Sequence, residues 1–135
     1  MNRLRHQLAA LEQLQDADGY WRTVLDHLET YAESSVTAGL AYGVLKGIRL
    51  GLLPSSYATM AERAIKAVLN NIDGEGNVLR GSSGTPIKQN VAGYMQVPFA
   101  ITPFTQGLAL MALCEFERSG PEVRDERLGA RCSMS

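Results

Sequence analysis

The segment that most restricts the fold of this chain is a stretch of helical periodicity that is rich in small residues. Between Glu33 and Leu50, apolar side chains recur at helical spacing, at Val36, Leu40, Val44 and Ile48. Three glycines interrupt the same stretch, at Gly39, Gly43 and Gly47. Each glycine inside a helix costs about 1 kcal/mol relative to alanine. Because close packing against several neighbours offsets such a cost, the sequence predicts a buried helix here.

A second helix of this kind is predicted from Thr102 to about Arg118. Thr102 and Pro103 are a capping residue followed by proline at the first helical position. Residues 107–114 are apolar or small on almost every side of this helix. Cys114 belongs to this run and is predicted to be a small core residue. This helix is therefore also expected to be surrounded by neighbours.

Two other helices carry only one apolar stripe and are expected on the outside. The first extends from Arg3 to about Gln15. The other opens with a serine cap at Pro54-Ser55-Ser56 and is ended by the turn Asp73-Gly74-Glu75-Gly76-Asn77. The order along the chain is thus outer, inner, outer, inner. The fold class predicted is all-α, built from antiparallel helical hairpins.

An acidic turn supports a repeat of these hairpins. Asp16-Ala17-Asp18-Gly19-Tyr20 follows the first helix, and Asp73-Gly74-Glu75-Gly76-Asn77 follows the third, about 57 residues later. A repeat of one outer and one inner helix is typical of an open solenoid or of a closed α/α toroid. Turns of this composition are common, so coincidence stays open as an alternative.

The segments between the helices are less regular. Tyr20 to Leu28 suits a short extended piece, and residues 78–101 form a long loop whose aromatic content favours order. After Ser119 the chain becomes charged and then small and polar. Residues 1–119 are therefore predicted to be one domain, and residues 120–135 a flexible tail.

Composition excludes several classes of function. The net charge is −1, so no electrostatic surface for nucleic acid or for an anionic membrane is expected. No apolar run of about 18 residues and no secretory signal are visible, and Cys114 and Cys132 do not form a disulfide framework. We expect a cytoplasmic protein. His6 and His27 lack neighbours at metal-ligand spacing, and no cofactor or metal site is predicted.

Five short motifs, in order, resemble the C-terminal part of glycoside hydrolase family 105 and the related family 88. They are Gln15-Asp16-Ala17-Asp18-Gly19-Tyr20-Trp21, Tyr31-Ala32-Glu33-Ser34-Ser35, Leu45-Lys46-Gly47-Ile48-Arg49-Leu50-Gly51, Ser83-Gly84-Thr85-Pro86, and the run from Pro103 to Met111 ahead of Glu115. No single motif is specific, but together they span about Leu8 to Arg118. The resemblance implies a partial (α/α)6 barrel, or toroid.

The resemblance also implies an activity. The family removes an unsaturated uronic acid from lyase products such as rhamnogalacturonan fragments. An aspartic acid protonates the ring carbon of the enol ether, water adds to the neighbouring carbon, and the hemiketal collapses with loss of the aglycone. The aspartate and its tryptophan-rich substrate motif lie N-terminal to the matched region. We therefore expect no catalytic residue in this chain, and inactivity of the chain alone.

Several residues are candidates for binding an oligosaccharide: Trp21, Glu33, Ser34, Ser35, Lys88 and Tyr94. Trp21 would stack on a sugar ring or anchor its loop by packing. The Glu33-Ser34-Ser35 run would meet a sugar carboxylate at a helix start, or simply cap that helix. Lys88 and Tyr94 would reach a ligand from the long loop, or help the loop to cover the barrel end. Asp16, Asp18 and Asp26 could also serve as acid–base groups, but Asp16 and Asp18 fit turn formation better.

Two alternatives remain from other classes of function. One is a non-catalytic helical interaction module, and the other is a truncated gene product. Four helices cannot close a ring of twelve, so the inner helices would expose apolar faces. Self-association through these faces is expected.

Overall fold

The computed structural model describes residues 2–119. Four long helices account for most of it: α1 (Asn2–Leu14), α2 (Ser34–Arg49), α3 (Ala58–Leu69) and α5 (Pro103–Arg118). The shorter elements are β1 (Trp21–Arg22), β2 (Ala32–Glu33), the 3-10 turn η1 (Ser55–Tyr57) and α4 (Val91–Met95). The predicted all-α class is confirmed. The predicted tail, residues 120–135, lies outside the described residues.

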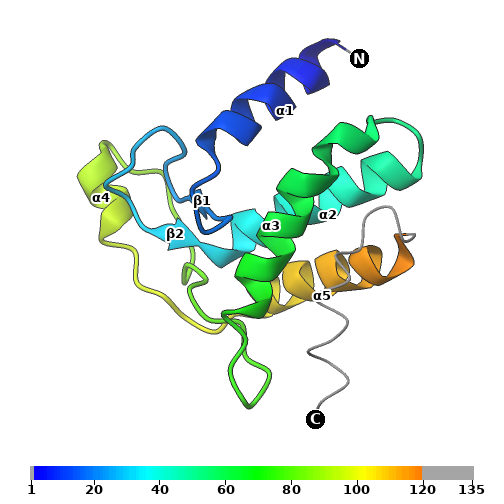
Figure 1. Ribbon diagram of the computed structural model, residues 1–135. Coiled ribbons are helices and arrows are strands. Elements are labelled where there is room, and N and C mark those ends of the chain that lie inside the picture. Colours follow the sequence, from blue (N-terminus) through cyan, green and yellow to red (C-terminus); the bar gives the residue numbers. More distant parts are fainter. Residues whose placement is uncertain (1, 120–135) are drawn as a thin grey trace.

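The long helices are arranged as antiparallel hairpins. In Figure 1, α2 and α5 start at the same end of the molecule, whereas α1 and α3 run the opposite way. α2 packs against both α3 and α5 along its length, so it is the central helix of the described part of the chain. The predicted alternation of outer and inner helices corresponds to this arrangement.

The core lies where α2, α3 and α5 meet, with α1 closing one side. Its largest fully buried side chains include Trp21, Leu45, Ile65 and Val68. Leu8 and Leu11 join the same cluster from α1, and Ala109, Ala112 and Phe116 join it from α5. Gly47 permits one close approach, since a Cβ atom there would lie 2.6 Å from Cδ1 of Leu53. Close packing was also predicted at Gly43, but a Cβ atom there would meet nothing within 4 Å.

Apolar side chains are exposed on the outward face of α5 and in the segment that follows α2. Phe104 and Leu110 of α5 are 70% and 64% exposed, and Leu50 at the end of α2 is 52% exposed. Cys114 is exposed as well, which corrects its prediction as a core residue. The reason is geometric: α5 buries one face against α2, and Cys114 lies outside that face. Among residues 2–119, neither helix is buried all round.

Two local predictions were wrong. Tyr20 to Leu28 is not extended as a whole, because only Trp21 and Arg22 pair with β2. The backbone then turns, with hydrogen bonds from His27 N to the carbonyl of Val24 (3.1 Å) and from Thr30 N to that of His27 (3.0 Å). The serine cap of the third helix is also absent. The chain there forms η1 first, and α3 begins without a side-chain cap.

The repeated turn is confirmed in atomic detail. Oδ1 of Asp16 accepts hydrogen bonds from the backbone amides of residues 18 and 20, at 3.0 and 2.9 Å. Oδ1 of Asp73 accepts from the amides of residues 75 and 77, both at 2.9 Å. The glycine at the fourth position is left-handed in both turns, with φ of 92° at Gly19 and 86° at Gly76. The two hairpins therefore share one turn geometry.

Candidate functional site

The loops gather at the end of the molecule where α2 and α5 begin (Figure 1). We call this the loop end and define it as residues 20–35 and 78–105. It contains β1, β2, α4 and every residue predicted from the sequence to bind a sugar. Helix starts leave backbone amides without helical partners, so this end offers donors unless side chains and loops satisfy them.

The carboxylate of Glu33 satisfies several of these donors. Glu33 is the N-cap of α2, and its Oε2 accepts from the amide of Val36 at 2.8 Å. The hydroxyl of Ser35 donates to both carboxylate oxygens, at 2.9 and 2.7 Å. Oε1 also accepts from the amide of Ser82 at 2.8 Å, which ties the loop after Val78 to the helix start. Glu33 is only 3% exposed, so its role in this structure is to cap α2 and hold the loop.

Ser34 fastens the same loop from the neighbouring position. Its hydroxyl donates to the carbonyl of Leu79 at 2.6 Å, and its amide donates to the carbonyl of Arg80 at 3.0 Å. Ser34 is fully buried. Of the three residues in the run 33–35, only Ser35 is half-buried, and its hydroxyl is directed to Glu33.

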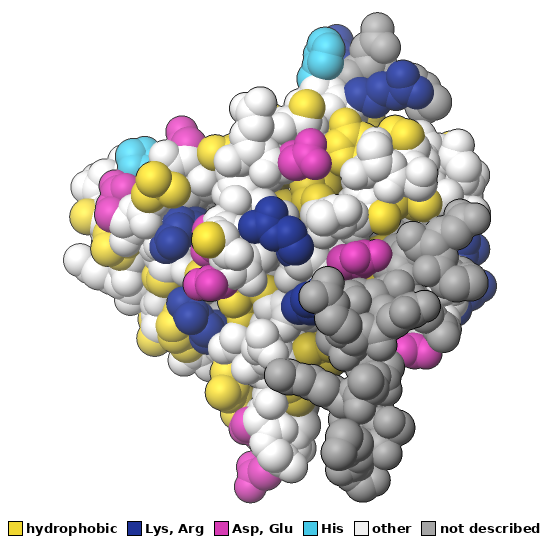
Figure 2. Space-filling view, in the orientation of Figure 1, with side chains coloured by type: hydrophobic (Ala, Val, Ile, Leu, Met, Phe, Trp, Pro, Cys, Tyr) yellow, Lys and Arg dark blue, Asp and Glu magenta, His cyan; other side chains and the backbone are white. Residues whose placement is uncertain are grey.

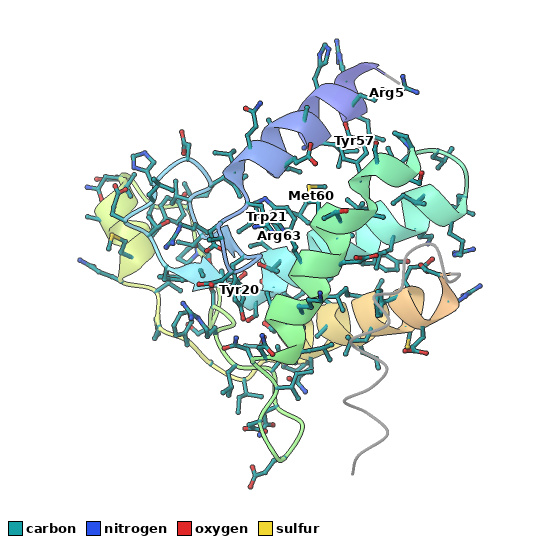
Figure 3. All side chains as sticks on the ribbon, in the orientation of Figure 1. Arg5, Tyr20, Trp21, Tyr57, Met60 and Arg63 are labelled. Carbon is teal, nitrogen blue, oxygen red and sulfur yellow. The ribbon has the colours of Figure 1, made fainter. Side chains whose placement is uncertain are left out.

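Trp21 is an anchor of the interior. It is completely buried, and its indole Nε1 donates to the carbonyl of Leu11 at 2.8 Å. Its backbone amide donates to Oγ1 of Thr37 at 3.1 Å. Figure 3 shows Trp21 between α1 and α3, close to Met60. No ring face is open to a sugar, so the structure supports the packing interpretation and not the stacking one.

Lys88 and Tyr94 lie together on the segment around α4. The backbone amide of Lys88 donates to the hydroxyl of Tyr94 at 3.3 Å, and Asn90 caps α4 by accepting from the amide of Gly93 at 2.9 Å. Both Lys88 and Tyr94 are half-buried. The long loop is thus ordered by its own hydrogen bonds, as its aromatic content predicted.

The start of α5 is held by the same kind of contacts. Thr102 caps it, because its Oγ1 accepts from the amide of Thr105 at 3.1 Å. Gly81 lies so close to the helix that a Cβ atom there would be 2.4 Å from Oγ1 of Thr105. Oε1 of Gln106 accepts from the amide of Val78 at 2.5 Å. The loop that starts at Val78 therefore bridges the beginnings of α2 and α5.

A group that sequence reasoning missed surrounds Arg80. The ring of Tyr31 packs edge-on against Phe99, with centroids 4.8 Å apart, and its hydroxyl lies 3.0 Å from Oγ of Ser82. The Arg80 guanidinium lies over the rings of Tyr20 and Phe99. These residues are up to 79 positions apart, and no local pattern marks them. Only the adjacent Tyr31-Ala32-Glu33 and Ser83-Gly84 motifs pointed to this part of the chain.

Carboxylates elsewhere have structural partners. Asp16 holds its turn and also lies 3.6 Å from the guanidinium of Arg22. Backbone hydrogen bonding from Asn77 lowers the pKa of Asp73, and burial raises the pKa of the Tyr20 phenol. Glu115 of α5 is paired with Arg49 of α2, and that pairing raises the pKa of Arg49. On the face drawn in Figure 2, acidic and basic side chains are interspersed.

No cluster of three potential metal ligands occurs within residues 2–119. In the same part of the chain, no helix is both long enough and apolar enough to cross a membrane.

Comparison with known proteins then identifies the family of this chain. The profile described as Glycosyl Hydrolase Family 88 matches residues 1–120. The chain belongs to glycosyl hydrolase family 88. The resemblance stated from the five sequence motifs is thereby confirmed.

The relatives of this family member are much longer than the chain. Unsaturated rhamnogalacturonyl hydrolase YesR of Bacillus subtilis is 38% identical over 113 residues, which are 83% of this chain and 31% of YesR. A solved structure from Klebsiella pneumoniae, described as a possible member of the GH105 family, is 40% identical with a TM-score of 0.80. It is matched over 83% of this chain and 29% of its own.

A similarly described structure from Salmonella enterica is 39% identical with a TM-score of 0.83, over 85% of this chain and 30% of its own. The chain therefore spans less than a third of the length of these relatives. Its helical hairpins superpose on part of their fold, which confirms the predicted partial toroid.

Proposed function

We propose that this chain is one segment of a hydrolase for unsaturated uronyl oligosaccharides, such as fragments of rhamnogalacturonan, and that its loop end contacts the sugar. The observation that carries the proposal is membership of family 88, with 38% identity to a relative named as an unsaturated rhamnogalacturonyl hydrolase. The loop end supports it, because one cross-linked loop organises the starts of two parallel helices there.

We propose further that the proton donor of the reaction lies outside this chain. Hydration of the enol ether needs a carboxylic acid that can reach the sugar and give up a proton. Glu33 is the carboxylate at the start of α2, and both its oxygens already accept hydrogen bonds from the protein. The segment would therefore bind and position, while chemistry would depend on the rest of a complete enzyme.

Two measurements on the purified chain test the proposal. Titration calorimetry with an unsaturated digalacturonide should show binding, and the absorbance of the substrate's double bond should stay constant. Turnover of about 1 per second or more would place a proton donor within this chain. Absence of binding at millimolar sugar would contradict the assignment of the loop end to sugar contact.

One observation favours a second function, that of a helical interaction module. An apolar groove of about 370 Å³ runs between α1 and α2, lined by residues such as Leu4, Leu8, Leu40, Gly43, Gly47 and Leu52. Apolar side chains on α5 are exposed too. We propose that a second copy of the chain covers these surfaces in the purified protein. Every chain in a purified sample is surrounded by identical copies, so a second copy is an available partner.

The cytoplasmic location predicted from the sequence is part of this proposal. The exposed thiol of Cys114 supports it, because a reducing compartment keeps an exposed thiol from oxidising. Cell fractionation would test it.

A further inference from the structure

Arg80 has an unusual backbone conformation for its residue type. Its φ is +63°, and among the described residues other than glycine it alone has a positive φ. Side chains rarely adopt this left-handed region, which glycine enters freely. The backbone joins this position to α2, because the carbonyl of Arg80 accepts from the amide of Ser34.

The side chain of Arg80 is held in place without a carboxylate. Its guanidinium carbon lies 5.5 Å from the ring centroid of Tyr20 and 6.0 Å from that of Phe99, within cation–π range of both. Arg22 and Arg49 each contact a carboxylate. Within residues 2–119, no carboxylate is within ion-pair distance of Arg80, which is exposed to solvent.

Phe99 gives the same place an apolar surface. It is 47% exposed, and the ring of Tyr31 packs against it in an edge-on arrangement. Tyr31 is fixed in turn through its hydroxyl contact with Ser82. Among the described residues the nearby Arg80 guanidinium has no carboxylate partner, so this place offers C–H packing and a fork of charged donors together.

We propose that Arg80 and Phe99 form a binding site for a carboxylate-bearing sugar, with the guanidinium on the carboxylate and the phenyl ring against the sugar face. This inference rests on the proposed function, because it assumes that a sugar reaches the loop end. It differs from the sequence-based candidates: Trp21, Glu33 and Ser34 are buried and occupied, whereas Arg80 and Phe99 are exposed.

The test compares digalacturonic acid with its dimethyl ester, which keeps the sugar but lacks the charges. Binding to each is measured by titration calorimetry for the unaltered chain, Arg80→Gln and Arg80→Gly. Arg5→Gln serves as the matched control, because Arg5 is an exposed arginine on α1 (Figure 3). Thermal melting of each variant shows whether it folds. Arg80→Gly should fold, since glycine accepts a φ of +63° without strain.

The proposal expects the acid to bind at least tenfold more tightly than the ester. Both Arg80 variants should lose that difference, and Arg5→Gln should keep it. Phe99→Leu should weaken both ligands. Equal binding of acid and ester, or full acid binding by folded Arg80→Gly, would overturn this site while leaving sugar binding intact. If neither compound binds the unaltered chain, both the site and the proposed sugar contact are wrong.

Discussion

Trp21 and Glu33 face each other across the short β1–β2 pair, and neither is available to a ligand. The sequence could single out both residues, because a lone tryptophan after an acidic turn and a carboxylate at a helix start are local features. It could not decide between binding and packing. That choice depends on the carbonyl of Leu11 and the amide of Ser82, which only the tertiary fold brings into contact with them.

Replacing Trp21 by alanine is expected to destabilise the fold severely. The change removes a fully buried side chain and leaves the Leu11 carbonyl without its indole donor, so we expect a loss of about 3–5 kcal/mol in the free energy of unfolding. Urea unfolding followed by circular dichroism measures it. Trp21→Phe should lose less, because it keeps most of the ring. In the unaltered chain, indole fluorescence should not respond to sugar; a saturable response would show that the ring is accessible.

The conformation and neighbours of Arg80 could not be predicted from the sequence, for a different reason. A positive φ is marked in a sequence only when glycine or asparagine occupies the position, and here the residue is an arginine between Leu79 and Gly81. Its aromatic neighbours come from 60 positions before it and 19 positions after it. Such a group becomes visible only when the chain is folded.

Helix starts were predictable where the signal was contained in a few residues. Thr102 followed by Pro103 gave the start of α5 correctly, because the cap bond joins residues three apart. The Pro54-Ser55-Ser56 signal failed because the chain first forms η1, which moves the start of α3 to Ala58. The loop 78–101 could be recognised as ordered, but its attachment to both α2 and α5 could not.

The cap of α5 is testable with two matched substitutions. Thr102→Ala removes the acceptor for the amide of Thr105, so we expect the free energy of unfolding to fall by about 1 kcal/mol. Thr59→Ala changes the same residue type at an exposed position inside α3, and should leave stability almost unchanged. Chemical denaturation of both variants gives the comparison. Equal effects would mean that the cap bond does not hold α5 in place.

The second acidic turn should make stability depend on pH. The pKa of Asp73 is lowered in the folded chain because the amide of Asn77 donates to its carboxylate. A carboxyl with a lowered folded pKa stabilises the fold above its unfolded pKa, near 4, and this contribution disappears as the pH falls through the lower, folded pKa. Asp73→Asn should therefore reduce the loss of stability as the pH falls below about 4.

Thermal melting across this range measures the effect. Asp26→Asn, an exposed carboxylate on the loop between β1 and β2, is the matched control. Identical acid profiles for Asp73→Asn and the unaltered chain would contradict the role given to the turn.

At the scale of the molecule, the sequence predicted the hairpins, the partial toroid and the exposed apolar faces of an incomplete ring, but it placed Cys114 in the core. Periodicity reports that a helix surface is apolar and does not report whether anything covers it. Cys114 and Leu110 show the difference, since both belong to an apolar run and both are exposed. The repeat could be predicted because the hydrogen bonds of each acidic turn join residues that are close together in the sequence.

Self-association is the expected consequence of these exposed faces. Each large apolar side chain left in water forfeits about 1.5–3 kcal/mol of burial, and Leu110, Phe104 and Leu52 are all more than half exposed. Light scattering should show association that grows with concentration, and hydrophobic dye should bind. Leu110→Glu should reduce both association and dye binding. Leu28→Glu, at a loop position that is even more exposed, should not. A monodisperse chain that melts cooperatively and binds no dye would show that these faces need no cover.

The two acidic turns also bear on how the chain folds. Within each turn, the hydrogen bonds that the aspartate side chain accepts join residues at most four positions apart. A turn of this kind can form on the timescale of local loop closure, before distant helices meet. Each hairpin then contributes its own nucleus, and neighbouring hairpins interact chiefly with one another. Because one core cluster joins side chains from all four long helices, we expect the two turns to form early and the hairpins to pack together as one unit.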